Sequence, residues 1–205
     1  MADKKRKRLV LIDGHALAYR MFFAIQASMS TREGEPTNAT YGFTRMLLNI
    51  INGNDPPDYM AVSFDVGETF RDAMYDAYKA TREKMPDALH VQIERIHDVL
   101  DAFNIPILEV DGYEADDVLG TLARKAQQAG VETFIVTGDK DLLQLVDDGV
   151  FVELPGGRTG EVTVYDREKV RERMGIEPEQ IVDYKALVGD TSDNIPGVPG
   201  IGDKT

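Results

Sequence analysis

The segment IPILEVDGYEADDVLGTLARKAQQAGVETFIVTGD (residues 105–139) predicts a strand, a helix and a second strand in succession. The short apolar runs at 105–110 and 132–139 are typical of buried strands. Between them, from Glu114 onward, apolar side chains recur on one side of a helix. Alternation of this kind forms a mostly parallel sheet flanked by helices. The segment therefore predicts an α/β fold.

The same alternation continues on both sides of this unit. Apolar runs at 9–13 and 59–65 predict two more strands, and helical spacing predicts helices over 39–51 and 89–103. Beyond about residue 150 the pattern predicts a hairpin of two short strands around a Gly-rich turn. A helix capped by Asp166 and ending near Met174 follows, and then a helix with Pro178 in its first turn that ends near Val188.

The composition limits the possible functions. The 205 residues are 42% hydrophobic, which is enough for a sizeable core. The net charge of −13 argues against indiscriminate nucleic-acid binding, unless the acids are clustered around bound metal. The absence of cysteine excludes disulfides and cysteine-ligated zinc, and the three histidines are scattered along the sequence. No apolar run reaches the ~20 residues that span a bilayer, and no signal-peptide core follows the basic N-terminus, so we expect a cytoplasmic protein.

Carboxylates recur at the ends of the predicted strands. A single aspartate at such a place ordinarily caps the following helix or starts a turn. Four recurrences at the carboxyl edge of one sheet, where ligands bind in open α/β folds, favour a ligand site instead. Two further acids in a late loop could close over that edge. The acids at or after the strand ends are Asp13, Asp65, Glu114, Asp116, Asp117, Asp139 and Asp141, and those of the late loop are Asp190 and Asp193.

A crevice of carboxylates without cysteine suits hard cations that prefer oxygen ligands. Mg²⁺ or Mn²⁺ fits such a site better than zinc. Two like charges about 4 Å apart repel by about 4 kcal/mol at an effective dielectric near 20, and bound cations would offset that cost. The number of acids exceeds the need of one Mg²⁺, so the sequence predicts two ions about 3.5–4 Å apart, the arrangement that cleaves phosphodiesters.

Basic residues follow the second strand in FRDAMYDAYKATREKMPDAL (residues 70–89). Arg71, Lys79, Arg82 and Lys84 alternate with tyrosines, which suits contact with a nucleic-acid backbone. A solvated helix with internal ion pairs would show the same charges. The position directly after Asp65 favours an overhang above the metal crevice. The Gly-rich stretch GVPGIGDKT (197–205) could in turn grip a phosphate through backbone N–H groups, although a plain turn has the same composition.

Five stretches together resemble the 5′-nuclease domain of bacterial DNA polymerase I, a member of the flap endonuclease superfamily. They are LIDGHALAYRMFFA (11–24), YKATR (78–82), YEADDVLGTLA (113–123), TGDKDLLQLV (137–146) and GDTSDNIPGVPGIGDKT (189–205). The resemblance spans essentially the whole chain, in order and spacing. It implies a PIN-like, mostly parallel α/β nuclease domain over 1–175 with a helical arch over about 70–89. It also implies that a helix-hairpin-helix DNA-binding region begins within 176–205.

The resemblance implies a metal-dependent 5′-3′ exonuclease and flap endonuclease. Such an enzyme hydrolyses phosphodiester bonds of 5′ flaps and 5′ ends of DNA or RNA by a two-metal mechanism, in primer removal and DNA repair. The expected partners are flapped DNA and RNA primer–DNA hybrids. The resemblance further implies a monomer fused to a polymerase domain in the full-length protein, with no membrane association.

Site residues also follow from the resemblance. Asp13, Asp65, Glu114 and Asp116 resemble ligands of the first metal, while Asp139, Asp141 and Asp193 resemble ligands of the second. Asp117 and Asp190 resemble accessory acids. By the same resemblance, Lys79 and Arg82 contact the scissile phosphate, and Arg71 and Tyr78 lie in the same nucleic-acid-binding segment. Tyr19 stacks under a base and Arg20 contacts a phosphate. The turn that holds the downstream duplex, with a potassium ion, contains Gly197, Gly200, Gly202 and Lys204.

The chain departs from the family pattern where it ends, at Thr205, inside the helix-hairpin-helix. We therefore expect a fragment in which metal binding is kept while DNA affinity and flap specificity are weakened. Two other functions remain open: a PIN-like single-strand ribonuclease, and a non-catalytic module that binds DNA junctions. A phosphatase that forms an aspartyl-phosphate is less consistent with the sequence, because the first strand ends in DGH without a second aspartate.

Overall fold

The computed structural model describes residues 6–26, 28–156 and 162–202. Their centre is one six-stranded sheet with the order β3-β2-β1-β4-β5-β6, in which only β6 runs antiparallel to its neighbour. The strands are β1 (Arg8–Asp13), β2 (Tyr59–Ser63), β3 (Ile107–Leu108), β4 (Glu132–Val136), β5 (Val150–Pro155) and β6 (Val162–Tyr165). The predicted α/β fold with a mostly parallel sheet is confirmed.

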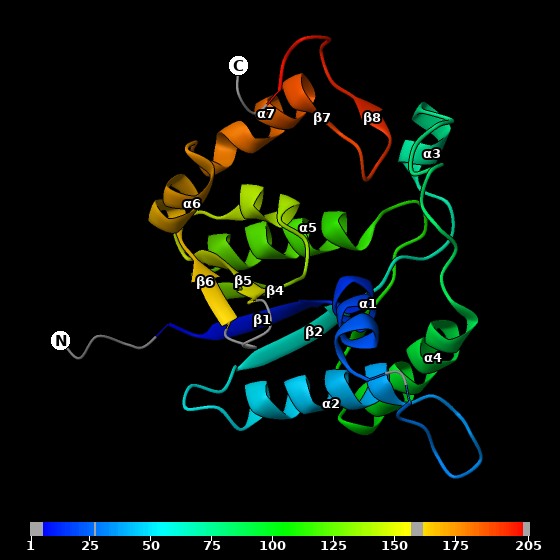
Figure 1. Cartoon of the computed structure of the whole chain (residues 1–205). Helices are drawn as coiled ribbons and strands as arrows, with labels where there is room; N and C mark the ends of the chain where they lie inside the picture. The colour runs from blue at the N-terminus through cyan, green and yellow to red at the C-terminus, as the bar shows by residue number, and fades with distance from the viewer. Residues whose placement is uncertain (1–5, 27, 157–161, 203–205) are drawn as a thin grey trace, which may run out of the picture.

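Helices cover both faces of this sheet (Figure 1). Successive residues of β1 point to opposite faces, so Val10 and Ile12 enter one core and Leu11 enters the other. One core is closed by α1 (Gly14–Ala24), α2 (Asn38–Ile51) and α4 (Asp87–Ala102). The other is closed mainly by α5 (Ala115–Gln128) and the 3₁₀ helix η1 (Asp141–Leu145).

A C-terminal segment extends away from the sheet (Figure 1). It consists of α6 (Arg167–Met174), the 3₁₀ turn η2 (Pro178–Gln180), α7 (Ile181–Val188) and a small antiparallel ladder of β7 (Gly189–Asp190) with β8 (Ile195–Pro196). The predicted cap of α6 is present, because Asp166 Oδ1 accepts a hydrogen bond from the backbone N–H of Lys169 at 2.9 Å. The β7–β8 ladder was not expected from a stretch so rich in Gly, Pro and Asp.

Two other segments differ from the expectation. The helix α1 was not expected, because its apolar residues surround the axis and form no single stripe. In the segment 70–89, helix covers only α3 (Phe70–Met74) and the start of α4, and between them a turn over 76–81 is followed by irregular chain over 82–86. Lys79 adopts a left-handed backbone (φ 52°) there, which interrupts any helix. Its backbone N–H donates to the carbonyl of Asp193 at 3.0 Å, so a tertiary contact holds this conformation.

No helix in the described ranges combines the length and the apolar character needed to cross a bilayer. This finding is consistent with the absence of a long apolar run in the sequence.

Candidate active site

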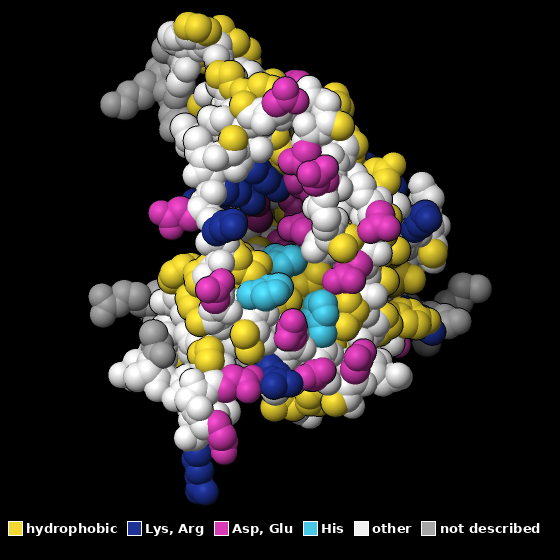
Figure 2. Space-filling model, turned by 90° about the vertical axis from the view of Figure 1, so that its right-hand side faces the viewer, with side chains coloured by type: hydrophobic (Ala, Val, Ile, Leu, Met, Phe, Trp, Pro, Cys, Tyr) yellow, Lys and Arg dark blue, Asp and Glu magenta, His cyan; other side chains and the backbone are white. Residues whose placement is uncertain are grey.

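A crevice of about 720 Å³ opens at the carboxyl ends of the central strands. Seven of the nine acids expected to bind metal line it, together with Tyr19, Lys79 and Arg82. The seven are Asp13, Asp65, Glu114, Asp116, Asp139, Asp141 and Asp193. Figure 2 shows Lys and Arg side chains facing Asp and Glu side chains across a hollow. The parallel sheet and the C-terminal segment thus bring together acids that are up to 180 residues apart in the sequence, since Asp13 and Asp193 share this crevice.

Asp13 is the most deeply placed of the strand-end acids. It ends β1 and caps α1, where Oδ1 accepts a hydrogen bond from Ala16 N–H at 3.0 Å. Its Oδ2 accepts from the Thr137 hydroxyl at 2.7 Å. The side chain is only 4% exposed, and burial raises its pKa to about 6 although both hydrogen bonds lower it. Asp13 is therefore a helix cap whose residue also lines the crevice.

Asp116 bears the strongest electrostatic strain in the crevice. Burial, followed by the charges of Asp13, Asp139, Asp65 and Glu114, raises its pKa to about 8. Among the described residues no side chain or backbone group forms a hydrogen bond with its carboxylate. A buried carboxylate surrounded by other acids is destabilised until a cation or a proton neutralises it.

Asp65 links two of the elements that border the crevice. It lies two residues beyond the end of β2, and its Oδ1 accepts a hydrogen bond from Ala115 N–H at the start of α5, at 2.7 Å. Its own backbone N–H donates to Nδ1 of His15 at 3.1 Å. The His15 ring packs edge-on against Phe64, which also contacts His97. The histidines are therefore not scattered in space, and Figure 2 shows them together on one face.

Glu114 accepts contacts from three residues of the segment 70–89. Lys79 Nζ lies 2.6 Å from its Oε1, and the Tyr78 hydroxyl lies 3.0 and 3.1 Å from its two oxygens. Arg71 Nη1 is 3.6 Å from Oε2. Burial and then the neighbouring acids Glu114 and Asp193 raise the pKa of Tyr78, so its hydroxyl remains a donor.

Asp193 joins the same cluster from the C-terminal segment. Its carboxylate pairs with the guanidinium of Arg82 and accepts from the Tyr78 hydroxyl at 3.2 Å. Asn194 next to it donates from Nδ2 to the carbonyl of Ala77 at 2.8 Å. The basic segment and the late acidic loop, which are more than 100 residues apart, are therefore fastened to each other above the crevice.

Asp117 lies outside the crevice and has a structural role. It forms a bidentate ion pair with Arg71, with distances of 2.6 and 2.8 Å. The same carboxylate accepts from Glu114 N–H at 3.1 Å, which completes a capping box at the start of α5. The hydrogen bond from Arg71 outweighs burial and lowers the pKa of Asp117. Its carboxylate is fully engaged in these contacts.

Asp139 and Asp141 lie just beyond β4. Asp139 N–H donates to the Thr137 hydroxyl at 2.9 Å, and its Oδ1 accepts from Asp141 N–H at 2.8 Å. Burial raises the pKa of Asp141 although Lys185 pairs with it. Asp190, the ninth expected acid, does not line the crevice, and its carboxylate is bound by Lys185 and Ser192.

Aromatic side chains flank the mouth of the crevice. Tyr19 stacks on Phe23 with ring centroids 6.4 Å apart and an interplanar angle of 27°. Phe23 is 72% exposed. An exposed stacked pair beside an acidic crevice offers a surface on which a base can stack. Phe23 was not singled out in the sequence, although it lies one helical turn after Tyr19.

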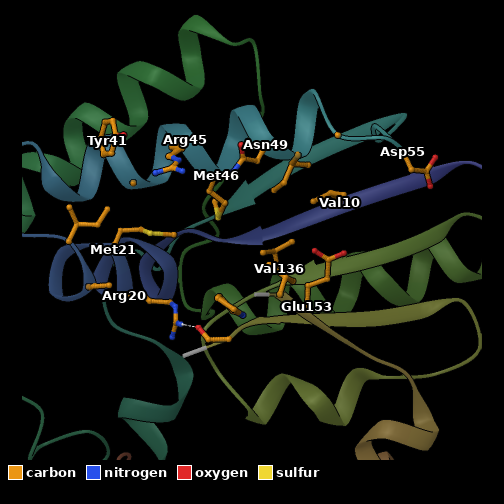
Figure 3. Close-up of a pocket in the computed structure, with 18 of the residues that line it drawn as sticks. Val10, Arg20, Met21, Tyr41, Arg45, Met46, Asn49, Asp55, Val136 and Glu153 are labelled. Carbon is orange, nitrogen blue, oxygen red and sulfur yellow. Dashed lines mark hydrogen bonds between the residues drawn. The ribbon is translucent and has the colours of Figure 1, made fainter. Parts of the chain in front are cut away.

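Arg20 does not reach the acidic crevice. It lines a second hollow of about 1160 Å³ between α1, α2 and the strands β1, β4 and β5, where Arg45 also points (Figure 3). Its guanidinium donates to the backbone carbonyl of Gly156. Gly197, Gly200 and Gly202 belong to the C-terminal turn and line neither hollow, and Lys204 lies outside the described residues.

The donor set of the crevice fits a divalent cation that prefers oxygen ligands. Its lining acids supply only carboxylate oxygens, and three of them, Asp13, Asp116 and Asp141, have raised pKa values that a bound cation would lower. Within the described part of the chain, however, no three His, Asp or Glu side chains stand close enough to hold one ion together. Instead, Lys79 forms an ion pair with Glu114, and Arg82 forms one with Asp193. Metal binding at these two acids therefore requires the basic side chains to move.

Three residues that contact the expected acids were not predicted from the sequence. Thr137, His15 and Lys185 each contact one or two of the expected acids. His15 lies two residues after Asp13, which is its only sequence signal. Thr137 and Lys185 reach their acids only through the fold.

Two family models match the chain in succession. The model described as the N-terminal resolvase-like domain of 5′-3′ exonuclease matches residues 8–175, and the model of the C-terminal SAM fold of 5′-3′ exonuclease matches residues 176–205. The two matches together include nearly all of the chain.

Curated relatives show the same similarity. The chain is 56% identical over 201 residues to DNA polymerase I of Chloroflexus aurantiacus, which covers 96% of this chain and 21% of the relative. It is 46% identical over 202 residues to DNA polymerase I of Bacillus subtilis, with 98% and 23% covered. The chain therefore spans about a fifth of the length of the curated relatives it matches.

Several solved structures have a fold similar to that of this chain. A flap endonuclease of bacteriophage T5, solved as a complex with DNA and metal ions, aligns with a TM-score of 0.73 at 23% identity and covers 97% of this chain and 72% of that one. The catalytic core of Rad2 with a DNA substrate aligns with a TM-score of 0.59 at 20% identity, with 96% and 58% covered. At such identities these likenesses concern the fold alone.

Proposed function

Because the chain belongs to the 5′-3′ exonuclease family, a family of nuclease hydrolases, we propose that it is a structure-specific 5′ nuclease. Its substrates are 5′ flaps and 5′ ends of DNA or RNA, whose phosphodiester bonds it hydrolyses. The observation that carries the proposal is the crevice in which seven carboxylates face Lys79 and Arg82. A crevice with both charges can bind divalent cations and a phosphate side by side.

We assign the metal-binding role to the lining acids. Asp13, Asp65, Glu114 and Asp116 would hold one Mg²⁺ or Mn²⁺ ion, and Asp139, Asp141 and Asp193 would hold a second. Such ions activate a water as the nucleophile and stabilise the oxyanions of an in-line displacement. Asp117 and Asp190 act on neighbouring side chains, since their carboxylates are already paired with Arg71 and Lys185.

Lys79 and Arg82 would hold the scissile phosphate. In the structure Lys79 and Arg82 pair with Glu114 and Asp193, so both basic side chains are already positioned at the edge of the crevice. With Glu114 and Asp193 bound to divalent ions, the side chains of Lys79 and Arg82 would be free to pair with a phosphate oxygen. Tyr19 and Phe23 would stack with the base next to the cut, and Tyr78 would orient Glu114 and Asp193 through its hydroxyl.

The likeness to DNA polymerase I supports a role within a longer protein. We propose that residues 1–175 form the nuclease domain and that 176–205 begin a region that binds the downstream duplex, including Gly197, Gly200, Gly202 and Lys204. Fused to a polymerase, such a nuclease would remove RNA primers and repair intermediates ahead of synthesis.

Cleavage of a 5′-flapped duplex in Mg²⁺ or Mn²⁺ tests the proposal. We expect cuts near the junction that require metal and that disappear in Asp116→Asn, a variant that keeps the side-chain volume but removes the charge. Lys125→Met, on the exposed face of α5, is the matched control and should cut like the wild type. Equal cutting by Asp116→Asn, or a preference for unpaired RNA over the flap, would reject the proposed substrate and site.

A further inference from the structure

Lys185 bridges two of the acids near the crevice. It projects from α7, and its Nζ lies 2.7 Å from Asp141 Oδ2 and 2.7 Å from Asp190 Oδ2. Asp141 belongs to η1 on the nuclease body, whereas Asp190 belongs to β7 in the C-terminal segment. One ammonium therefore takes an oxygen from each of two carboxylates that come from different parts of the fold.

The surroundings of Lys185 explain why a cation is stable there. Asp190 also accepts from the Ser192 N–H at 2.9 Å and from the Ser192 hydroxyl at 2.6 Å, so its carboxylate is held in one orientation. Asp139 lies next to Asp141 and accepts its backbone N–H at 2.8 Å. Within the described ranges, Lys185 is the only Lys or Arg that pairs with Asp141 or Asp190. Its side chain is about one-third exposed, so water reaches the ion pair with Asp141.

We propose that Lys185 is a positioning residue that acts as a built-in cation at the subsite of the second metal ion. This outer subsite consists of Asp139, Asp141 and Asp193, and the inner one contains Asp13 and Asp116. By pairing with Asp141, Lys185 occupies a carboxylate oxygen that a divalent ion would use, and it draws Asp141 toward Asp190. Lys185 thereby lowers the affinity of the outer subsite, so the second ion binds more weakly than the inner one. This inference rests on the proposed metal-binding role of Asp141.

The competition has a direct electrostatic origin. A unit positive charge near a divalent ion repels it, and an ammonium that bridges two carboxylates reduces their charge from −2 to −1. Removal of the ammonium returns a full carboxylate charge to the subsite. The inner acids Asp13 and Asp116 do not contact Lys185, so their ion should be little affected.

Calorimetric titration of the whole chain with Mn²⁺, without DNA, tests the proposal. Lys185→Met removes the charge and keeps an unbranched side chain that is shorter by one atom. We expect the weaker Mn²⁺ to bind about tenfold more tightly in this variant, a factor that corresponds to about 1.4 kcal/mol. Lys185→Gln is a second neutral variant, which can still donate a hydrogen bond to one acid. It should show the same gain in Mn²⁺ affinity, and it replaces Lys185→Met in the test if that variant does not fold.

Two controls separate charge from structure. Lys185→Arg keeps the positive charge and should bind Mn²⁺ like the wild type, and Lys125→Met removes an exposed charge of α5 and should change nothing. Thermal unfolding provides an independent readout: the rise in Tm on adding Mn²⁺ should be larger in Lys185→Met than in the wild type.

Unchanged or weaker binding of the second Mn²⁺ in both neutral variants would overturn the proposal. Weaker binding would mean that Lys185 places Asp141 correctly for the metal, and unchanged binding would mean that it only fastens α7 to η1. The titration requires no cleavage. An inactive wild-type protein would therefore count against the proposed nuclease without affecting this comparison.

Discussion

Asp116 couples the stability of the metal-free protein to pH. Its pKa is raised from 3.8 to about 8 in the fold, mainly by burial. Between these values the folded protein holds a proton that the unfolded chain has lost, so the free energy of unfolding falls as pH rises through this window. Below about pH 4 the carboxyl is protonated in both states and has no effect.

Replacement of this acid should therefore stabilise the metal-free protein. In EDTA at pH 8 we expect Asp116→Asn to raise the free energy of unfolding by about 1–3 kcal/mol, and to raise it less at pH 5, where the wild-type carboxyl is protonated in the fold. Urea denaturation at the two pH values measures the difference. An equal gain at both pH values would show that the charge of Asp116 is not the cause.

Protons and divalent ions should compete for the same buried oxygens. Asp13 and Asp116, with pKa values of about 6 and about 8, must lose protons before they can act as ligands. We expect the affinity for Mn²⁺ to rise about tenfold per pH unit between pH 6 and pH 7.5. Calorimetry in buffers of different ionisation enthalpy would detect the released proton. A pH-independent affinity would place the ion on other acids.

Lys79 should affect catalysis without supporting metal binding. Its ammonium pairs with Glu114 at 2.6 Å in the metal-free protein, so its removal frees an acid and leaves every carboxylate in place. We expect Lys79→Met to slow flap cleavage by about 10²–10³-fold, the usual loss when one donor to a transition-state oxyanion is removed. Mn²⁺ binding should be equal to the wild type or tighter. Single-turnover cleavage and titration separate the two effects, and weakened metal binding would assign Lys79 a structural role.

At the scale of elements, the first residue of α1 lies very close to Phe64, the residue that follows β2. A Cβ on Gly14, the first residue of α1, would lie 2.4 Å from the ring of Phe64, which is fully buried between His15 and His97. The ring cannot swing away without disturbing the core. Glycine is therefore the residue that fits without a shift of its neighbours where the helix starts directly after Asp13.

Gly14→Ala should be destabilising for this reason. We expect the free energy of unfolding to fall by about 1–3 kcal/mol, the usual cost of overpacking a filled core. Phe64→Leu replaces the ring with a smaller side chain, so the double mutant should recover part of the lost free energy of unfolding. A double-mutant cycle measures this coupling. Urea denaturation measures both. Strict additivity of the two changes would contradict a direct clash between these residues.

The sequence predicted elements whose signal is local. The helices α2, α4 and α5 carry an apolar stripe, and the strand-end acids follow from the rule that parallel strands share a carboxyl edge. Sequence patterns did not predict the local structure where tertiary contacts determine it. The left-handed Lys79 is held by a contact with Asp193, and the strand expected over 105–110 is reduced to β3, which pairs with β2 only at Val62 and Ser63. No pattern in the sequence reports that Lys79 and Arg82 pair with acids of the crevice itself.

At the scale of the whole molecule, the net charge of −13 opposes an approach to DNA. The basic residues above the crevice are mostly engaged by acids in the metal-free protein, so they cannot offset this repulsion. We expect the affinity for a flapped duplex in Ca²⁺ to exceed the affinity in EDTA at least about tenfold, and to fall with added salt. Fluorescence anisotropy at constant ionic strength tests this. Equal affinity in EDTA would mean that the duplex binds away from the crevice.

The strand order also dictates when the sheet can be completed during synthesis. The first strand made, β1, lies at the centre and pairs with β2 and β4, so its second edge stays open until residues 132–136 have left the ribosome. Pairings this distant in sequence form slowly, and an unfilled apolar edge invites association with other chains. We therefore expect the nascent chain to aggregate while the residues between β2 and β4 are being synthesised. Slower translation of these residues should not reduce aggregation, because it prolongs the time during which the edge of β1 is open.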